Sequence, residues 1–143
     1  MSQLPQPDDR PDDHAQTQLE QIATRAYDLA RTGETEALAA YVGAGLPANL
    51  TNQDGDTLLM LAAYHGHGET VQMLIDAGAD PDRLNDRGQS PLAGAIFKGE
   101  DAVVRILLGA GADADHGTPT ARAAAEMFER PAYLELMGPA TQG

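Results

Sequence analysis

The stretch NQDGDTLLMLAAYHGHGETVQMLIDAGADPDRL (Asn52–Leu84) decides the fold of this chain, because its pattern returns in the residues that follow it. The positions Asn52, Gly55, Thr57, Leu59 and Ala62 recur 33 residues later as Asn85, Gly88, Ser90, Leu92 and Ala95. Two series of glycines keep the same interval, namely Gly33, Gly66 and Gly99, and Gly45, Gly78 and Gly111. A fixed period of about 20–50 residues is typical of stacked repeats, in which each unit buries its apolar face against its neighbours. The period therefore predicts a stack of similar units, an architecture that usually supplies a binding surface.

The composition excludes several classes of protein. The chain has 143 residues, of which 42% are hydrophobic, so it fits one domain whose core must be aliphatic because it has two Phe, four Tyr and no Trp. It contains no apolar run long enough to span a membrane. It also has no cysteine, which excludes disulfides, thiol catalysis and a thiolate zinc site. Acidic residues stand near the start, where a secretory signal needs basic and apolar ones, so we expect a cytoplasmic protein.

The strongly negative net charge of the chain limits the kinds of partner that it can bind. The formal net charge is −13, from 22 acidic and 9 basic residues, and Lys98 is the only lysine. A surface of this sign repels phosphate groups, so we expect neither nucleic acid nor an anionic membrane as a partner. The acidic residues serve either to keep the protein soluble or to steer a basic partner toward it, and the composition leaves both open.

The N-terminal part of the chain predicts a tail followed by a helix pair. Residues 1–16 are rich in Pro, Gln and Asp and poor in apolar residues, so we expect a disordered acidic tail. From Thr17 onward, apolar residues fall at helical spacing up to Gly33, and a short second helix is expected over Thr35–Val42. This pair has no turn ahead of it and is expected to act as an N-terminal cap unit.

The residues that follow predict two complete helix pairs and a shorter last pair. Thr57 and Ser90 are expected to cap the first helix of each complete pair, with Pro91 at the first helical position. Thr118–Pro119 looks like a third copy of Ser90–Pro91, which places the last pair at Pro119–Phe128 and Pro131–Met137. The predicted organisation is a tail (1–16), an N-terminal cap unit (17–49), full units (50–82 and 83–115), a truncated C-terminal unit (116–138) and a short tail (139–143).

These residues resemble the ankyrin repeat, whose period is 33 residues and whose unit is a turn followed by two antiparallel helices. The resemblance is carried by Asp54–Ala63, Gly66–His67, Leu74–Ile75 and Gly78–Asp80, and it covers roughly residues 17–138. It implies an all-α ankyrin-repeat solenoid of about four stacked helix–turn–helix units joined by short hairpin-like turns.

One departure from the family concerns its Thr-Pro-Leu-His signature. That signature appears here as Thr57–Met60 and Ser90–Ala93, so its histidine is absent from both copies. In the family this histidine ties the turn to the helix. The tie must here come from other residues, and we expect modest stability.

The sequence offers little support for catalysis. Ser90 is explained as a helix cap, and no phosphate-binding Gly-Lys-Ser/Thr motif exists. His65 and His67 are two residues apart, so on a helix they diverge by about 200° and cannot hold one ion.

Three pairs of aspartates suggest a metal site: Asp54 with Asp56, Asp80 with Asp82, and Asp113 with Asp115. A calcium loop aligned on Gly55 would place Leu50 and Leu61 where acids are needed, so we favour a role in turns. We expect no cofactor and no metal, and we keep a metal-dependent enzyme that uses these aspartates as the alternative.

The resemblance also implies a binding surface made by the turns, called fingers here, and the first helices. Carried over by position, the candidate partner-binding residues are Gln53, Asp54, Asp56, Asp86, Arg87 and Gln89 on the fingers, and Tyr64, His65, Phe97 and Lys98 on the helices. Tyr64 and Phe97 are one repeat apart and are expected to be neighbours at the exposed helix ends. They are either contact residues or the rim of the core.

The function predicted from these observations is a non-catalytic protein–protein interaction module with an accessory or regulatory role. It is expected to be a monomer that binds a partner protein on its concave face. The partner is expected to carry a basic patch. The chain resembles small stand-alone bacterial ankyrin proteins. A secreted host-directed effector would use the same surface and stays open as an alternative.

Overall fold

The computed structural model describes residues 11–139, with side chains from residue 16 onward. Within these residues the chain forms eight helices and no strand, which confirms the all-α prediction. The helices are α1 (Pro11–Thr32), α2 (Thr35–Gly43), α3 (Leu58–Tyr64), α4 (Gly68–Asp76), α5 (Pro91–Lys98), α6 (Asp101–Gly109), α7 (Ala121–Met127) and α8 (Pro131–Met137). None of them is long and apolar enough to cross a bilayer.

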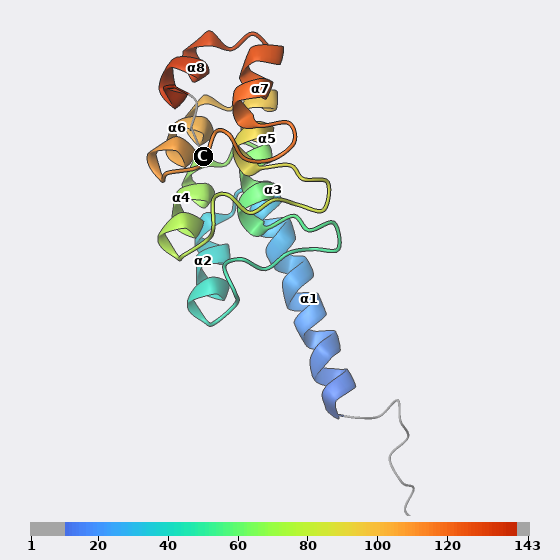
Figure 1. The fold of residues 1–143 in the computed structure, drawn as a ribbon. Coiled ribbons are helices and arrows are strands. Elements are labelled where there is room, and N and C mark those ends of the chain that lie inside the picture. The colour runs from blue at the N-terminus through green and yellow to red at the C-terminus, as the bar shows by residue number, and fades with distance from the viewer. Residues whose placement is uncertain (1–10, 140–143) are drawn as a thin grey trace, which may run out of the picture.

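The helices form two layers that run the length of the stack (Figure 1). One layer holds α1, α3, α5 and α7, each packed on the next, and the other holds α2, α4, α6 and α8 in the same order. The segments that join consecutive pairs project together to one side, beyond the first layer (Figure 1). Four consecutive helix pairs therefore stack as expected of an ankyrin-repeat solenoid.

The helix starts of the two complete pairs follow from local chemistry. The Thr57 Oγ1 accepts a hydrogen bond from the Met60 N–H at 3.0 Å, and the Ser90 Oγ accepts one from the Ala93 N–H at 3.1 Å. Both caps satisfy an N–H that has no partner inside the helix. Pro91 stands at the first helical position, where its missing N–H costs nothing. The predicted caps are confirmed.

The start of the last pair differs from the prediction. The cap of α7 is Thr120, whose Oγ1 accepts from the Ala123 N–H at 3.0 Å, so the helix begins at Ala121 and not at Pro119. Thr118 instead belongs to the turn, where its N–H donates to the Gly88 carbonyl at 2.8 Å. The alignment of Thr118–Pro119 with Ser90–Pro91 was wrong, because a hydrogen bond between neighbouring fingers holds Thr118 outside the helix.

The first helix also begins earlier than predicted. Helix α1 starts at Pro11, so the prediction of a disordered tail is wrong for residues 11–16. A proline at the first helical position followed by acidic residues in the first turn is a favourable helix start. The rest of the predicted tail, residues 1–10, and residues 140–143 of the predicted C-terminal tail lie outside the described residues.

The core is aliphatic, as the composition predicted. The largest side chains that are fully buried come from both layers and include Leu29, Leu38, Leu59, Leu74, Leu92, Ile96 and Leu107. On the faces of α4 and α6 that pack on other helices, Val71, Leu74, Val103, Val104 and Leu107 are buried, and Ile75 and Leu108 are partly buried. Burial of each such side chain stabilises the fold by about 1.5–3 kcal/mol. The stack is therefore held by contacts between units.

The fingers are stabilised by asparagine side chains. The Asn52 Oδ1 accepts from the backbone N–H groups of Asp54 and Asp56, at 2.9 and 3.0 Å. Its equivalent Asn85 accepts in the same way from Arg87 and Gln89, both at 3.0 Å. An asparagine side chain that bonds nearby backbone in this way mimics a backbone turn. These bonds explain how the fingers keep a hairpin-like shape without the signature histidine.

Neighbouring fingers are also bonded to each other. The Asp86 N–H donates to the Asp54 carbonyl at 3.0 Å, and the Asn85 Nδ2 donates to the Asp56 Oδ1 at 2.9 Å. The hydrogen bond from Thr118 to Gly88 continues the series to the next finger. The fingers therefore form one continuous edge of the stack.

Replacement of Glu129 by glycine is expected to stabilise the protein by about 0.5–1 kcal/mol. Glu129 precedes the last helix with a φ of +53°, whereas the other units have a glycine with positive φ at this place, as in Gly66 and Gly99. A residue with a Cβ in this conformation costs about 1–2 kcal/mol. Glycine avoids this cost, but it loses more conformational entropy on folding, which cancels part of the gain. Urea denaturation checks the change. The control is Glu126→Gly inside α7, which should destabilise, and a loss of stability in Glu129→Gly would contradict the strain.

The stability of the stack is expected to fall as the pH rises from about 10 to 12, because of Tyr133. This residue is buried in α8, and its hydroxyl donates to the Asp101 Oδ1 at the start of α6. Burial, together with that bond and the charge of Asp101, raises the pKa of Tyr133 to about 12. The folded chain therefore keeps the phenol proton in a range where the unfolded chain, with a pKa near 10, loses it.

Urea denaturation between pH 9 and 12 measures this dependence. In Tyr133→Phe, the free energy of unfolding should change less with pH over this range, because the phenol group that titrates has been removed. An unchanged slope in Tyr133→Phe would show that the phenol does not titrate as described.

Candidate functional site

Two aromatic side chains stand exposed at the ends of first-layer helices. Tyr64 ends α3 and is 39% exposed, and Phe97 lies near the end of α5 and is 51% exposed. Both are exposed, as the register predicted. A contiguous patch of exposed apolar side chains, unlike single scattered ones, marks a contact site.

The ring contacts differ from the expected pairing. Phe97 packs edge to face on Phe128, with ring centroids 5.1 Å apart, so its ring partner comes from the next unit and not from Tyr64. Tyr64 instead lies under Lys98, whose Nζ is 5.1 Å from the ring centroid, and beside His65. A cation over a ring face is attracted by about 0.5–1 kcal/mol at an exposed site. Tyr64 and Phe97 are still close enough to line one groove.

This groove, called the apolar groove here, is formed by the first-layer helices and turns of three consecutive units. It has a volume of about 500 Å³, and its lining comes from α3, α5, α7 and the fingers: Met60, Tyr64, Gln89, Ser90, Ala93, Gly94, Phe97, Pro119, Ala124, Met127 and Phe128. Most of this lining is apolar, and Met127 and Phe128 are 66% and 39% exposed. A smaller hollow of about 270 Å³ adjoins it and shares the wall made by Met60, Tyr64 and Gln89.

Met127 and Phe128 were not predicted as site residues, because the cap of the last unit was placed at Thr118 and not at Thr120. Tyr64 follows its cap Thr57 by seven residues, and Phe97 follows Ser90 by seven. Counted from the true cap Thr120, Met127 stands at the same place and Phe128 is the equivalent of His65 and Lys98. The signal was therefore present in the sequence, but the register of the last unit concealed it.

The candidate finger residues lie at the rim of this face. Gln53, Asp54, Asp86, Arg87 and Gln89 are exposed, and Asp56 is partly buried. Asp56, Arg87 and Gln89 line the smaller hollow, and Gln89 also lines the apolar groove. Gln53, Asp54 and Asp86 line neither. The structure therefore brings Asp56, Tyr64, Arg87, Gln89 and Phe97 together and leaves the other finger residues at the edge.

The two histidines have different surroundings. The His67 Nε2–H donates to the Arg31 carbonyl at 2.8 Å, so His67 has a structural role at the start of α4. His65 is exposed and contacts the Tyr64 ring. Its pKa is lowered by partial burial and then by the charges of His67, Lys98 and Arg31. His65 therefore stays neutral more readily than a free histidine.

Two of the three aspartate pairs act as turn residues. The Asp80 Oδ1 accepts from the Asp82 N–H at 2.9 Å, and the Asp113 Oδ1 accepts from the Asp115 N–H at 2.8 Å. The Asp82 Oδ1 reaches the next unit and accepts from the Asp113 N–H at 2.7 Å. No group of three histidine, cysteine or acidic side chains that could hold a metal ion occurs in the part of the chain that is described. The interpretation of the aspartates as turn formers is confirmed for these two pairs, whereas at Asp54 and Asp56 the turn is bonded by the Asn52 side chain.

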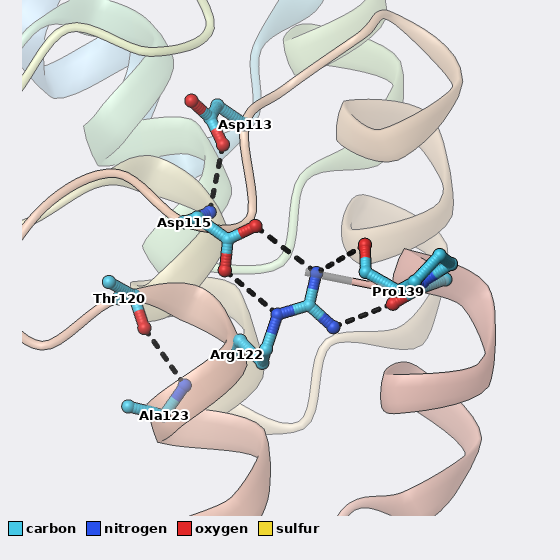
Figure 2. A network of polar contacts seen from close by, with 7 residues as sticks. Asp113, Asp115, Thr120, Arg122, Ala123 and Pro139 are labelled. Atoms are coloured by element: carbon cyan, nitrogen blue, oxygen red, sulfur yellow. Dashed lines mark hydrogen bonds and ion pairs between the residues drawn. The ribbon is translucent and has the colours of Figure 1, made fainter. Parts of the chain in front are cut away.

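Figure 2 shows how the last of these aspartates connects to the end of the stack. The Arg122 guanidinium in α7 donates to both carboxylate oxygens of Asp115, at 2.8 and 3.2 Å. It also donates to the carbonyls of Gly138 and Pro139, at 2.6 and 3.2 Å. The hydrogen bond to the Asp115 side chain, the main cause, raises the pKa of Arg122. This cluster joins the final finger to the C-terminal end of α8 and so holds the unit that carries Met127 and Phe128.

Comparison with known proteins agrees with this architecture. Residues 27–118 match the family model for ankyrin repeats in three copies. An ankyrin repeat protein of Pseudomonas aeruginosa is 44% identical over 65 residues, which are 46% of this chain and 38% of that protein. The crystal structure of the human ASB11 ankyrin repeat domain superposes with a TM-score of 0.60 at 29% identity, over 62% of this chain and 40% of that one.

The matched part of this chain thus spans well under half the length of either relative. The family model, in contrast, matches more than half of this chain, in the same units whose helix pairs and fingers are described above. The chain therefore belongs to the ankyrin repeat family.

Proposed function

We propose that this protein is a non-catalytic interaction module that binds a partner protein on the face formed by the fingers and the first-layer helices. Ankyrin repeats are generally protein–protein interaction modules, and the family is typically not enzymatic. The observation that carries the proposal for this chain is the apolar groove with four exposed large side chains around it: Tyr64, Phe97, Met127 and Phe128. A contiguous exposed apolar surface with a polar rim is characteristic of a contact site.

The charges at the rim support a basic partner surface. The candidate residues of this face include three acidic side chains, Asp54, Asp56 and Asp86, and two basic ones, Arg87 and Lys98. The whole chain carries a net charge of −13. A negative field of this kind speeds the approach of a positive surface and disfavours acidic ones. We propose a monomeric accessory or regulatory protein of the cytoplasm that acts by such binding.

Affinity purification from native lysate of the source cells tests the proposal. The wild-type chain is compared with Tyr64→Ala/Phe97→Ala, which removes two exposed rings without opening the core. We expect the specific partner to be lost from the double variant, because truncation of an aromatic contact residue costs about 2 kcal/mol or more, or about 30-fold in affinity.

A matched control removes exposed side chains from the second layer. Leu136 of α8 is 42% exposed, and Arg105 of α6 is also exposed. Leu136→Ala/Arg105→Ala should keep the partner. Equal recovery of the same proteins by the wild-type chain and by Tyr64→Ala/Phe97→Ala would show that the assigned face is wrong.

A further inference from the structure

The apolar groove and the smaller hollow beside it have different chemistry but one shared wall. Met60, Tyr64 and Gln89 line both. On one side of this wall lie Phe97, Met127 and Phe128, and on the other lie Asp56, Asn85 and Arg87. A ligand that fills both hollows must therefore present an apolar group and a polar group close together.

The apolar groove can accept large apolar side chains of different shapes. Its volume of about 500 Å³ exceeds what a single leucine or phenylalanine side chain occupies, and two of its lining residues are methionines. Methionine side chains adapt their shape and contact aromatic rings favourably. The edge-to-face pair of Phe97 and Phe128 gives the groove one firm wall. Such a site selects for apolar character and size more than for one residue type.

The smaller hollow offers an acceptor for a positive charge. The Asp56 carboxylate is partly buried, and its Oδ1 accepts one hydrogen bond, from the Asn85 Nδ2. A carboxylate has about four acceptor sites, so this bond leaves capacity for a further donor. The cation Lys98 is held over the Tyr64 ring, and no ion pair joins it to Asp56 among the described residues. Arg87 lines the same hollow and is exposed, so its guanidinium has to extend into water for a second cation to bind.

We propose that this site binds a segment of a partner protein in which a large aliphatic or aromatic side chain stands within about three residues of a lysine or arginine. The apolar side chain enters the apolar groove, and the cation meets Asp56 in the adjoining hollow. The spacing follows from the shared wall, because an extended chain advances about 3.3 Å per residue. The inference rests on the proposed function and specifies which kind of partner segment the face selects.

Selection from a displayed library of random twelve-residue peptides tests this inference on the full chain. We expect the enriched peptides to share an apolar or aromatic residue close to a lysine or arginine. A synthetic peptide of the enriched sequence is then titrated into isotope-labelled protein, and shifts of backbone amide signals should centre on α5, α7 and the finger of residues 85–90.

Variants separate the two contacts. Phe97→Ala/Met127→Ala should weaken binding of the selected peptide by about 10-fold or more, since it removes walls of the groove. Asp56→Asn keeps an acceptor for the Asn85 side chain but removes the charge. It should therefore weaken binding of this peptide by about 3–10-fold and reduce the dependence of binding on salt. The same peptide with alanine in place of its basic residue should bind the wild-type chain and Asp56→Asn equally. Leu136→Ala/Arg105→Ala serves as the surface control, and circular dichroism confirms that each variant is folded.

Three outcomes would overturn the inference: no enriched peptide, an enriched sequence without the apolar and basic pair, or amide shifts that lie elsewhere. These outcomes are distinguishable from failure of the proposed function. A partner that is captured from lysate and lost in Tyr64→Ala/Phe97→Ala would still support binding at this face, through a surface other than a short apolar and basic segment.

Discussion

Leu74→Ala will lower the free energy of unfolding by about 3 kcal/mol. Leu74 is fully buried in α4, the second-layer helix that packs on α3 within its own unit and on α2 and α6 in the units on either side. Truncation removes buried apolar surface and leaves a cavity, because helices held on three sides cannot close the space. The effect is large for a small stack, since typical domains are stable by only about 5–15 kcal/mol.

Urea denaturation followed by circular dichroism measures this loss. The control is Gln72→Ala in the same helix, which changes an exposed side chain and should alter stability by about 0.5 kcal/mol or less. The denaturant dependence should stay that of one transition, because every unit of so short a stack depends on its neighbours. A loss below about 1 kcal/mol in Leu74→Ala would mean that α4 is not packed on both neighbouring units.

Gly55→Ala is expected to destabilise the protein by about 3 kcal/mol, and the equivalent Gly88→Ala by about 1–2 kcal/mol. The two glycines occupy the same place in consecutive fingers, with φ of +78° and +77°. The conformational cost of adding a Cβ is therefore the same at the two positions. At Gly55, however, the added Cβ would also lie 2.8 Å from the Asp86 backbone nitrogen, whereas at Gly88 the nearest atom is the Thr118 Cβ at 3.9 Å.

The difference between the two variants measures the contact between fingers. In Gly55→Ala the neighbouring finger must move, and the hydrogen bond from the Asp86 N–H to the Asp54 carbonyl should be lost with it. Amide hydrogen exchange of Asp86 reports this loss directly, beside urea denaturation of both variants. Equal stability of the two alanine variants would show that the fingers are not in contact at Gly55.

The local parts of the fold could be predicted from the sequence because each depends on neighbours in the chain. The caps Thr57 and Ser90 act within one turn of helix, and the finger hydrogen bonds of Asn52 and Asn85 act within four residues. The exposed positions of Tyr64 and Phe97 followed from the same local register. The prediction was wrong at Thr118, because its role depends on Gly88 in another finger.

The candidate site was predictable only in part. The first-layer positions Tyr64 and Phe97 line the apolar groove as the register suggested, and Asp56 and Gln89 join them from the fingers. Met127 and Phe128 were missed because the last unit is shorter and its true cap, Thr120, is displaced from the pattern. Without an exact copy to align, periodicity alone does not show which residue of a shortened unit faces a neighbour.

By itself, the sequence determined that the chain builds repeated helix pairs with capped helices and an aliphatic core, because spacing and local hydrogen bonds suffice for these. Only the tertiary structure decided that Phe97 pairs with Phe128, that Lys98 covers Tyr64, and that the apolar groove shares one wall with the smaller hollow. These contacts join side chains of different units. Their distances depend on how far each unit is displaced and turned relative to the next, which follows from packing of the whole stack.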